Sequence, residues 1–132
     1  MKSLKKSILA VGLAVAVITA IGGANVFAAP QTQSAIVAGY GVYCRSDIKY
    51  GSATAYTEYG SYATVSVESR YNYCKTSNGE GGHKNNGTGS NKRAALSFSA
   101  PSGCKSVSIS STHRLTAGGQ NWSTSTFDDK EA

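Results

Sequence analysis

Cysteine and histidine are the residue types in this 132-residue chain that could support nucleophilic or metal chemistry. The three cysteines are Cys44, Cys74 and Cys104, and the two histidines are His83 and His113. A catalytic pair would require one of the imidazoles beside a thiolate. No two of these residues have a C-x-x-C or H-x-x-x-H spacing, so the sequence predicts no metal site.

Neither histidine lies where catalysis is expected. His83 falls in a glycine- and asparagine-rich segment that is poorly suited to accurate placement, and His113 falls on a predicted strand, where a structural role is the commoner one. The paired carboxylates of a glycosidase would have to come from residues such as Glu58 and Glu68, which occupy surface positions of predicted strands. No glycine-rich segment continues into the Lys-Ser/Thr of a phosphate-binding loop. We therefore expect no enzyme and no cofactor.

The N-terminus has the three parts of a secretory signal. Residues 1–6 are basic, residues 8–21 are uncharged and almost wholly apolar, and small residues lead to an expected cleavage site after Ala28. An uncleaved anchor is the alternative, but the apolar run is shorter than the about 20 residues that a spanning helix needs. We expect a signal peptide, residues 1–28, and a secreted, extracellular single β domain, residues 29–132, with no stable membrane span.

Export makes a disulfide the default for paired cysteines. Three cysteines allow three pairings, each with one thiol left over. In a simple meander, Cys44 and Cys74 each end a strand at the same edge, whereas Cys104 begins a strand at the opposite edge. We therefore expect a Cys44–Cys74 disulfide. Cys104 is then either a buried, inert thiol or a site for an intermolecular disulfide or a nucleophile.

Basic residues outnumber acidic ones. The chain has 13 Lys and Arg against 7 Asp and Glu, and removal of residues 1–28 leaves 10 basic residues and a net charge of +3. An acidic tail, residues 128–132, has a net charge of −2, so the positive charge is concentrated in the rest of the domain. A cationic exported protein is attracted to anionic cell walls and lipid headgroups. A solubilising surface charge is the competing interpretation, and export argues against nucleic acid as a partner.

Alternation of apolar and polar residues predicts strands throughout residues 29–132. The clearest run is 63–74, whose odd positions are apolar or small, as in a strand with one buried face. Gly60-Ser61 suits a two-residue hairpin turn that would pair this run with residues 52–59. Further strands are expected at 36–43, 93–100, 104–115 and 122–127. The predicted fold is all-β, a small antiparallel β-sandwich or barrel of about six or seven strands.

Residues 75–91 form a low-complexity segment, KTSNGEGGHKNNGTGSN, with no apolar side chain. Because such a segment has nothing to bury, we expect a flexible Gly/Asn-rich loop. This loop is the basis of a second hypothesis, in which the protein is an inhibitor or adhesion module that binds another extracellular protein.

All eight tyrosines lie between residues 40 and 73. Alternation predicts that Tyr56, Tyr71 and Tyr73 are buried. Tyr59 and Tyr62 would then lie exposed at the hairpin tip, and exposed tyrosine beside arginine or lysine is a common recognition surface. High β-propensity in a small protein is the competing explanation. The candidate binding residues are Tyr59, Tyr62, Arg70 and Arg93.

A secretory signal followed by a compact β domain resembles the Sec-secreted lactococcin family of β-sandwich bacteriocins. The residues that carry the resemblance are Gly-Tyr-Gly at 39–41, SATAY at 52–56, SYATV at 61–65 and, as a later strand, AALSF at 94–98. The resemblance implies an antibacterial protein that interferes with cell-wall synthesis at the surface of related Gram-positive cells. It brings no catalytic residues with it.

These observations together predict a secreted, cationic, non-enzymatic β protein. Its expected function is that of a bacteriocin-like or cell-envelope-binding antibacterial protein. The expected partner is the bacterial cell envelope or a wall precursor, and the alternative partner is an extracellular protein.

Overall fold

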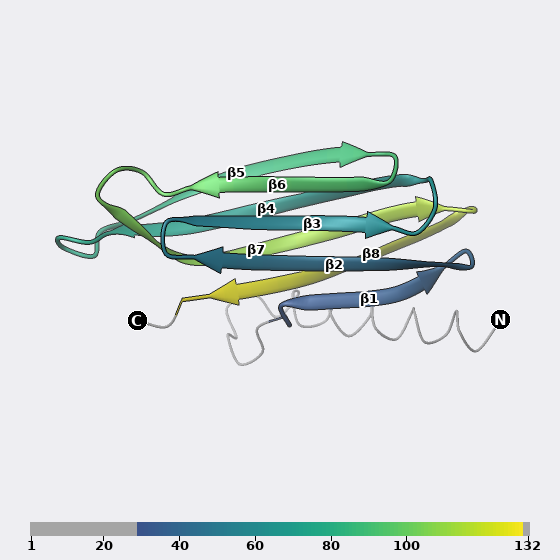
Figure 1. The fold of residues 1–132 in the computed structure, drawn as a ribbon, viewed down its shortest axis with the longest axis horizontal. Helices are drawn as coiled ribbons and strands as arrows, with labels where there is room; N and C mark the ends of the chain where they lie inside the picture. Colours follow the sequence, from purple (N-terminus) through teal and green to yellow (C-terminus); the bar gives the residue numbers. More distant parts are fainter. Residues whose placement is uncertain (1–28, 131–132) are drawn as a thin grey trace.

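The computed structural model describes residues 29–130, which form eight β-strands (Figure 1). The predicted signal peptide, residues 1–28, and the last two residues of the predicted acidic tail lie outside the described residues. The all-β prediction is confirmed, with eight strands rather than six or seven. The strands are β1 (Thr32–Val37), β2 (Tyr40–Lys49), β3 (Ser52–Tyr59), β4 (Thr64–Lys75), β5 (Gly81–Ser90), β6 (Arg93–Ser99), β7 (Cys104–Ala117) and β8 (Gln120–Asp129).

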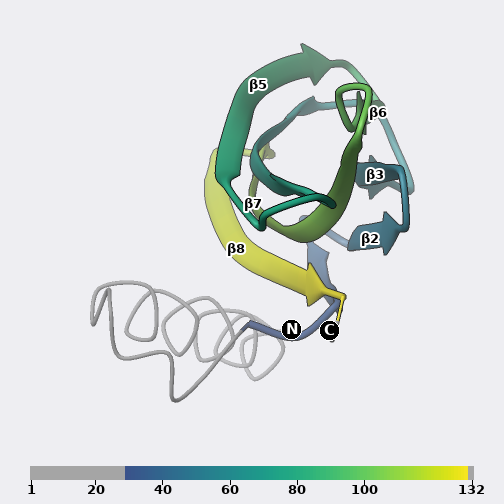
Figure 2. The ribbon, with the colours of Figure 1, turned by 90° about the vertical axis from the view of Figure 1, so that its left-hand side faces the viewer.

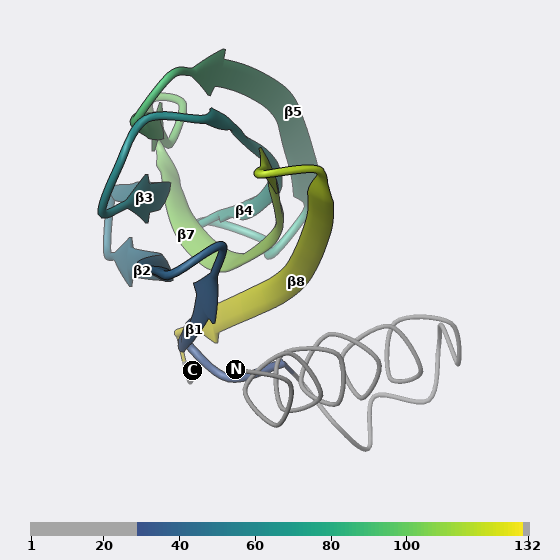
Figure 3. The ribbon, with the colours of Figure 1, turned by 90° about the vertical axis from the view of Figure 1, so that its right-hand side faces the viewer.

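Two antiparallel four-stranded sheets pack face to face as a sandwich. Sheet A has the strand order β1-β2-β3-β6, and sheet B has the order β5-β4-β7-β8. Figure 2 shows from one end how both sheets curve around a common interior, and Figure 3 shows the same from the other end. The two sheets meet at the β1–β8 side, where the Phe127 amide on β8 donates to the carbonyl of Pro30, just before β1, at 2.9 Å.

The core lies between the inner faces of the two sheets. On β4, Val65 and Val67 are buried while the residues between them point outward, and on β6, Leu96 and Phe98 follow the same pattern. This alternation is the one predicted for both strands from the sequence, because a period of two puts every second side chain on one face.

The strand predicted at residues 36–43 is wrong, because the chain reverses within it. Ala38 and Gly39 have φ angles of 49° and 86°, and two successive positive φ angles define the type I′ turn that suits a two-residue hairpin loop. The register closes around this turn with Val37 opposite Tyr40. Two strands, β1 and β2, therefore replace one.

The hairpin predicted at Gly60-Ser61 is also wrong. β3 pairs with β2 and β6, whereas β4 pairs with β5 and β7. Residues 60–63 therefore carry the chain from sheet A to sheet B. The Tyr59 amide donates to the Lys92 carbonyl and the Ala63 amide donates to the Asn91 carbonyl, both at 2.9 Å, so this crossing is held against the β5–β6 turn.

Most of the segment predicted as a flexible loop, residues 75–91, is a strand. β5 pairs with β4 along its whole length and forms an edge of sheet B, although its side chains are almost all exposed. Backbone hydrogen bonds to β4 supply the order that side-chain burial does not. Gly82 fits this arrangement because a Cβ atom there would lie 2.7 Å from the Tyr73 ring.

Candidate functional site

The outer face of sheet A carries a cluster of tyrosine and charged side chains on β2, β3 and β6. The antiparallel register places Arg45 opposite Tyr56. It also places Glu58 opposite Tyr43 on one side and opposite Arg93 on the other. Directly opposite residues project from the same face of a sheet. We call this continuous surface, made of Tyr43, Arg45, Tyr56, Glu58 and Arg93, the tyrosine–arginine face.

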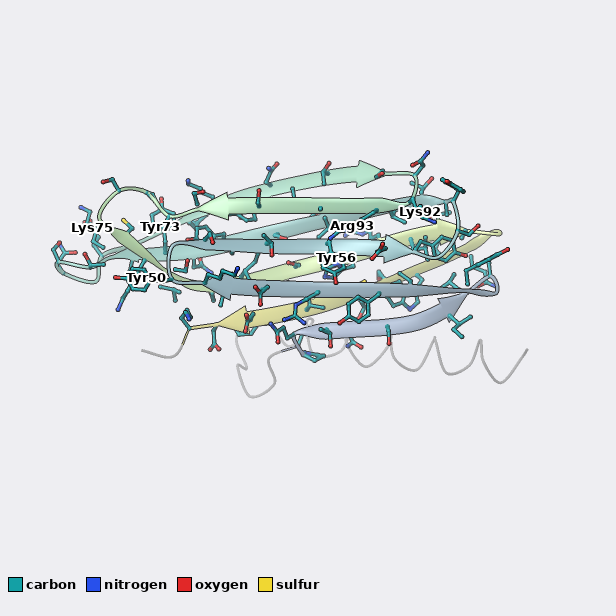
Figure 4. All side chains as sticks on the ribbon, viewed as in Figure 1. Tyr50, Tyr56, Tyr73, Lys75, Lys92 and Arg93 are labelled. Atoms are coloured by element: carbon teal, nitrogen blue, oxygen red, sulfur yellow. The ribbon has the colours of Figure 1, made fainter. Side chains whose placement is uncertain are left out.

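Contacts between neighbouring side chains hold this face in place. The Cζ atom of Arg93 lies 4.3 Å from the centroid of the Tyr56 ring, which is a cation–π geometry. The rings of Tyr43 and Tyr56 lie 6.0 Å apart, within the range of aromatic pairs. Figure 4 shows Tyr56 and Arg93 side by side, with Lys92 farther toward the end of the molecule.

The protonation states on this face suit a binding surface. A hydrogen bond with Tyr43 raises the pKa of the Arg45 guanidinium, and Arg45 Nη2 also lies 3.4 Å from Asp47 Oδ1. Partial burial raises the pKa of the Tyr56 hydroxyl. At neutral pH the Arg45 guanidinium is therefore positive, and the Tyr56 phenol is neutral and can donate a hydrogen bond.

A second aromatic and cationic pair lies at the end of sheet A, where residues 60–63 leave it. The Lys92 ammonium lies 4.9 Å from the centroid of the Tyr62 ring, and Tyr62 is 73% exposed. Because Lys92 precedes Arg93 in sequence, this pair extends the charge of the tyrosine–arginine face toward the end of the molecule. Tyr62 is thus exposed as predicted.

Tyr59 is not a surface residue, so its predicted place at an exposed tip is wrong. It occupies an inner position of β3 and is 2% exposed. Its hydroxyl donates to the Val37 carbonyl at 2.6 Å, and its ring packs edge-on against Tyr40 at 6.0 Å. Tyr56 takes the outer position on the same strand, so its predicted burial is wrong as well, whereas Tyr71 is buried as predicted.

Arg70 and Arg93, both candidate binding residues, lie on different sheets. Arg93 begins β6 in sheet A, whereas Arg70 is exposed on the outer face of β4 in sheet B, with Nε 3.4 Å from Asn72 Oδ1. The structure therefore places Tyr62 against Lys92, the residue that precedes Arg93, and leaves Arg70 on the other sheet. Tyr43 and Arg45 belong to the site but were missed, because only the β2–β3 register shows that they share a face with Tyr56.

The expected Cys44–Cys74 disulfide is absent, since all three cysteines of the described residues are free thiols. Cys44 is buried in the middle of β2 rather than at a strand end, and burial raises the pKa of its thiol to about 12. Cys74 and Cys104 are half-buried at the ends of the neighbouring strands β4 and β7, where they face Lys105 and Lys75. The meander that suggested the pairing does not form, because β4 belongs to the other sheet.

His113 occupies the core. Its Nδ1 lies 2.8 Å from Thr57 Oγ1, and Thr57 also hydrogen-bonds to the Cys44 thiol. Both His113 and Cys44 are 0% exposed, so no substrate could reach this Cys–Thr–His arrangement. His83 is exposed on β5, opposite Asn72. It belongs neither to the tyrosine–arginine face nor to the buried Cys–Thr–His arrangement.

Residues 29–130 contain no group of three or more His, Cys, Asp and Glu side chains placed to hold a metal ion. Within the same residues, no helix has the length and apolar character needed to span a membrane. No protein-family model, curated protein or solved structure matches this chain. The tyrosine–arginine face, with the adjoining Tyr62 and Lys92, is the strongest candidate for function.

Proposed function

We propose that this protein is a secreted, cationic, non-enzymatic antibacterial protein that binds the bacterial cell envelope through the tyrosine–arginine face. The observation that carries this proposal is the joined set of Tyr43, Tyr56 and Arg93 on one exposed surface. Tyrosine and arginine are enriched at the centres of binding interfaces. An aromatic ring gives a large contact area at a small cost in side-chain entropy, and its hydroxyl adds a hydrogen bond.

The placement of the face on strands supports a binding role. β2 and β3 are paired along their length, and each also has a second neighbour in sheet A. Side chains on paired strands are held more accurately than side chains on loops. Less conformational entropy is then lost when a ligand binds.

The charge of the domain supports the same role. Residues 29–132 have a net charge of +3. The outer surfaces of Gram-positive cells are anionic, and such a charge accelerates encounter with them. Attraction of this kind falls with ionic strength, so binding to cells should weaken as salt is added.

The first test adds purified residues 29–132 to growing Gram-positive indicator cells and follows viability and permeability. Growth arrest without prompt leakage is the expected result and favours a wall target, whereas prompt leakage would indicate attack on the membrane. A double variant, Tyr43→Ala with Arg93→Ala, should lose cell binding and killing. Absence of any effect on several indicator strains would contradict the proposal.

A matched control removes the same residue types elsewhere. Tyr50, 63% exposed, lies at the β2–β3 turn, and Arg70 lies on sheet B. Tyr50→Ala with Arg70→Ala therefore loses one tyrosine and one positive charge without touching the face. This control should kill as the unmodified protein does. Equal killing by both double variants would exclude the tyrosine–arginine face as the binding surface.

A second candidate function is binding of another extracellular protein by β5. β5 is an edge strand of sheet B with exposed side chains, and an unpaired strand edge can add a strand from a partner. Lysine substitutions protect edges from such pairing. A His83→Lys, Asn85→Lys variant that retains cell killing would argue against β5 as the functional surface, whereas loss of killing in a folded variant would favour it.

A further inference from the structure

Two glycines lie side by side at one end of the tyrosine–arginine face. The Gly60 amide donates to the Gly41 carbonyl at 2.8 Å, and a Cβ atom on Gly60 would lie 3.3 Å from the same carbonyl oxygen. On Gly41 itself, a Cβ atom would meet no other atom within 4 Å. We call Gly41 and Gly60 the glycine floor. The space above Gly41 is open on the outer face of sheet A.

Apolar and aromatic side chains border this floor. Ile36 on β1 lies directly opposite Gly41, and it is 39% exposed. Tyr43, 41% exposed, is the next outward-facing residue along β2. A ring-shaped ligand on the glycine floor could therefore contact an aliphatic side chain on one side and an aromatic side chain on the other.

A hydrogen-bond acceptor and a hydrogen-bond donor lie beyond the glycine floor on the same face. The cross-strand row that contains Tyr43 continues through Glu58 to Arg93. Glu58 is exposed, and it takes part in none of the ion pairs found among residues 29–130. A carboxylate accepts hydrogen bonds, whereas guanidinium groups only donate them.

This mixture of donors and acceptors selects among envelope components. An anionic phosphate polymer or lipid headgroup would be repelled by an unpaired carboxylate in the middle of its site. Sugar hydroxyl groups, by contrast, need both a donor and an acceptor, and the faces of pyranose rings pack on tyrosine. Ile36 offers an apolar contact for the methyl group of an acetamide.

We propose that the glycine floor, with Ile36, Tyr43 and Glu58, binds an N-acetylated pyranose unit of a glycan chain. One sugar ring lies over Gly41 against Tyr43 and its hydroxyl groups bond to Glu58, while the next ring of the glycan chain reaches Arg93. This proposal rests on the proposed function, because it names the class of envelope component that the same surface recognises.

Titration of purified residues 29–132 with N-acetylglucosamine hexasaccharide, followed by amide chemical shifts, tests the proposal. Saturable shifts should centre on Gly41, Tyr43 and Gly60. Gly41→Val fills the open space with a residue that favours strands, so this variant should fold and weaken binding by about tenfold or more. Thr54→Val is the matched control on the same face, and it should bind as the unmodified protein does.

A charge reversal separates sugar from phosphate recognition. Glu58→Lys should weaken binding of the hexasaccharide because it removes the acceptor, whereas it would strengthen binding of a glycerol phosphate polymer. No saturable binding of the hexasaccharide, or equal binding by Gly41→Val, overturns the glycan assignment. If the protein still binds cells in that case, the proposed function stands and only the ligand class is wrong. If the protein binds neither the hexasaccharide nor cells, both proposals are overturned.

Discussion

The Nε2 atom of His113 on β7 lies 2.7 Å from the Oγ1 atom of Thr126 on β8, in the interior of the sandwich. The Nδ1 atom of the same ring lies 2.8 Å from Thr57 Oγ1 on β3, in the opposite sheet. The Oγ1 atom of Thr126 also lies 2.6 Å from the Oγ atom of Ser46 on β2. The Ser46 hydroxyl in turn donates to Ser111 Oγ on β7 at 2.7 Å. A polar network therefore joins the two sheets through their core. Since buried polar groups are costly without partners, this network favours one relative position of the sheets.

Acid should destabilise the fold through His113. Burial lowers the pKa of this imidazole from its ordinary value of 6.5 to about 4. Below the unfolded pKa the unfolded chain binds a proton that the folded protein does not, so stability falls as the pH drops from 6.5 toward 4. The loss at the lower end is about 3 kcal/mol. Urea unfolding at a series of pH values between 6.5 and 4 measures this loss of stability.

Two variants identify the residue responsible for this pH dependence. His113→Asn should be less stable than the unmodified protein at neutral pH, and its stability should change little between about pH 6.5 and 5, above the range where most carboxylates titrate. His83→Gln, at an exposed position on β5, should keep the full decline. An unchanged decline in His113→Asn would show that another group causes it.

Two threonines on the same strand should respond in opposite ways to removal of their hydroxyl groups. Thr126 Oγ1 bonds to both Ser46 and His113. Thr126→Val therefore leaves the buried Nε2 atom of His113 without this partner, and Ser46 keeps only its bond to Ser111, so the change should cost about 1–3 kcal/mol. Thr124 Oγ1 is buried with no partner among the described residues, so Thr124→Val should be neutral or stabilise by about 1 kcal/mol. Thermal and urea unfolding of both variants makes the comparison. A loss of the same size in both would contradict the network.

The difference between Tyr59 and Tyr62 should appear in stability. Tyr59→Phe removes the hydroxyl that donates to the buried Val37 carbonyl and should lower the free energy of unfolding by about 1–3 kcal/mol. Tyr62→Phe alters an exposed side chain and should change the free energy of unfolding by less than about 0.5 kcal/mol. Urea unfolding of both variants measures the difference. Equal effects would mean that Tyr59 is not anchored as the structure shows.

The strands with local alternation could be predicted from the sequence. Val65 and Val67 on β4 and Leu96 and Phe98 on β6 recur every second residue, and this period alone predicts which face is buried. β5 could not be predicted in this way because it has no apolar side chain. Its order comes from the backbone of β4, which is a partner that sequence patterns do not reveal.

The connection after β3 shows a second limit. Gly60-Ser61 has the turn chemistry of a hairpin, but the same residues serve a crossing between sheets. Which strand becomes the neighbour depends on burying both inner faces at once, and this is decided by distant residues such as Phe98 and Ile109. The predicted pairing of residues 52–59 with residues 63–74 therefore fails, although the limits of β3 are those predicted.

The candidate site depended on the same long-range information. Tyr62 and Arg93 could be proposed from exposure and residue type alone. Tyr43, Arg45 and Tyr56 join them only because β2 pairs with β3 in a register that brings Arg45 opposite Tyr56. A one-residue shift of this register would move every one of these side chains relative to its neighbours.

The three thiols should differ in reactivity. Cys44 is buried and its pKa is raised to about 12, so almost none of it is thiolate at neutral pH, and the thiolate is the reactive form. Cys74 and Cys104 are partly exposed at strand ends. Iodoacetamide should therefore add two groups to the folded protein and a third only in denaturant, as measured by intact mass. A Cys44→Ala variant should take up the same two groups when folded. Rapid addition of three groups to the folded protein would contradict the burial of Cys44, and addition of fewer than two would contradict the free state of Cys74 and Cys104.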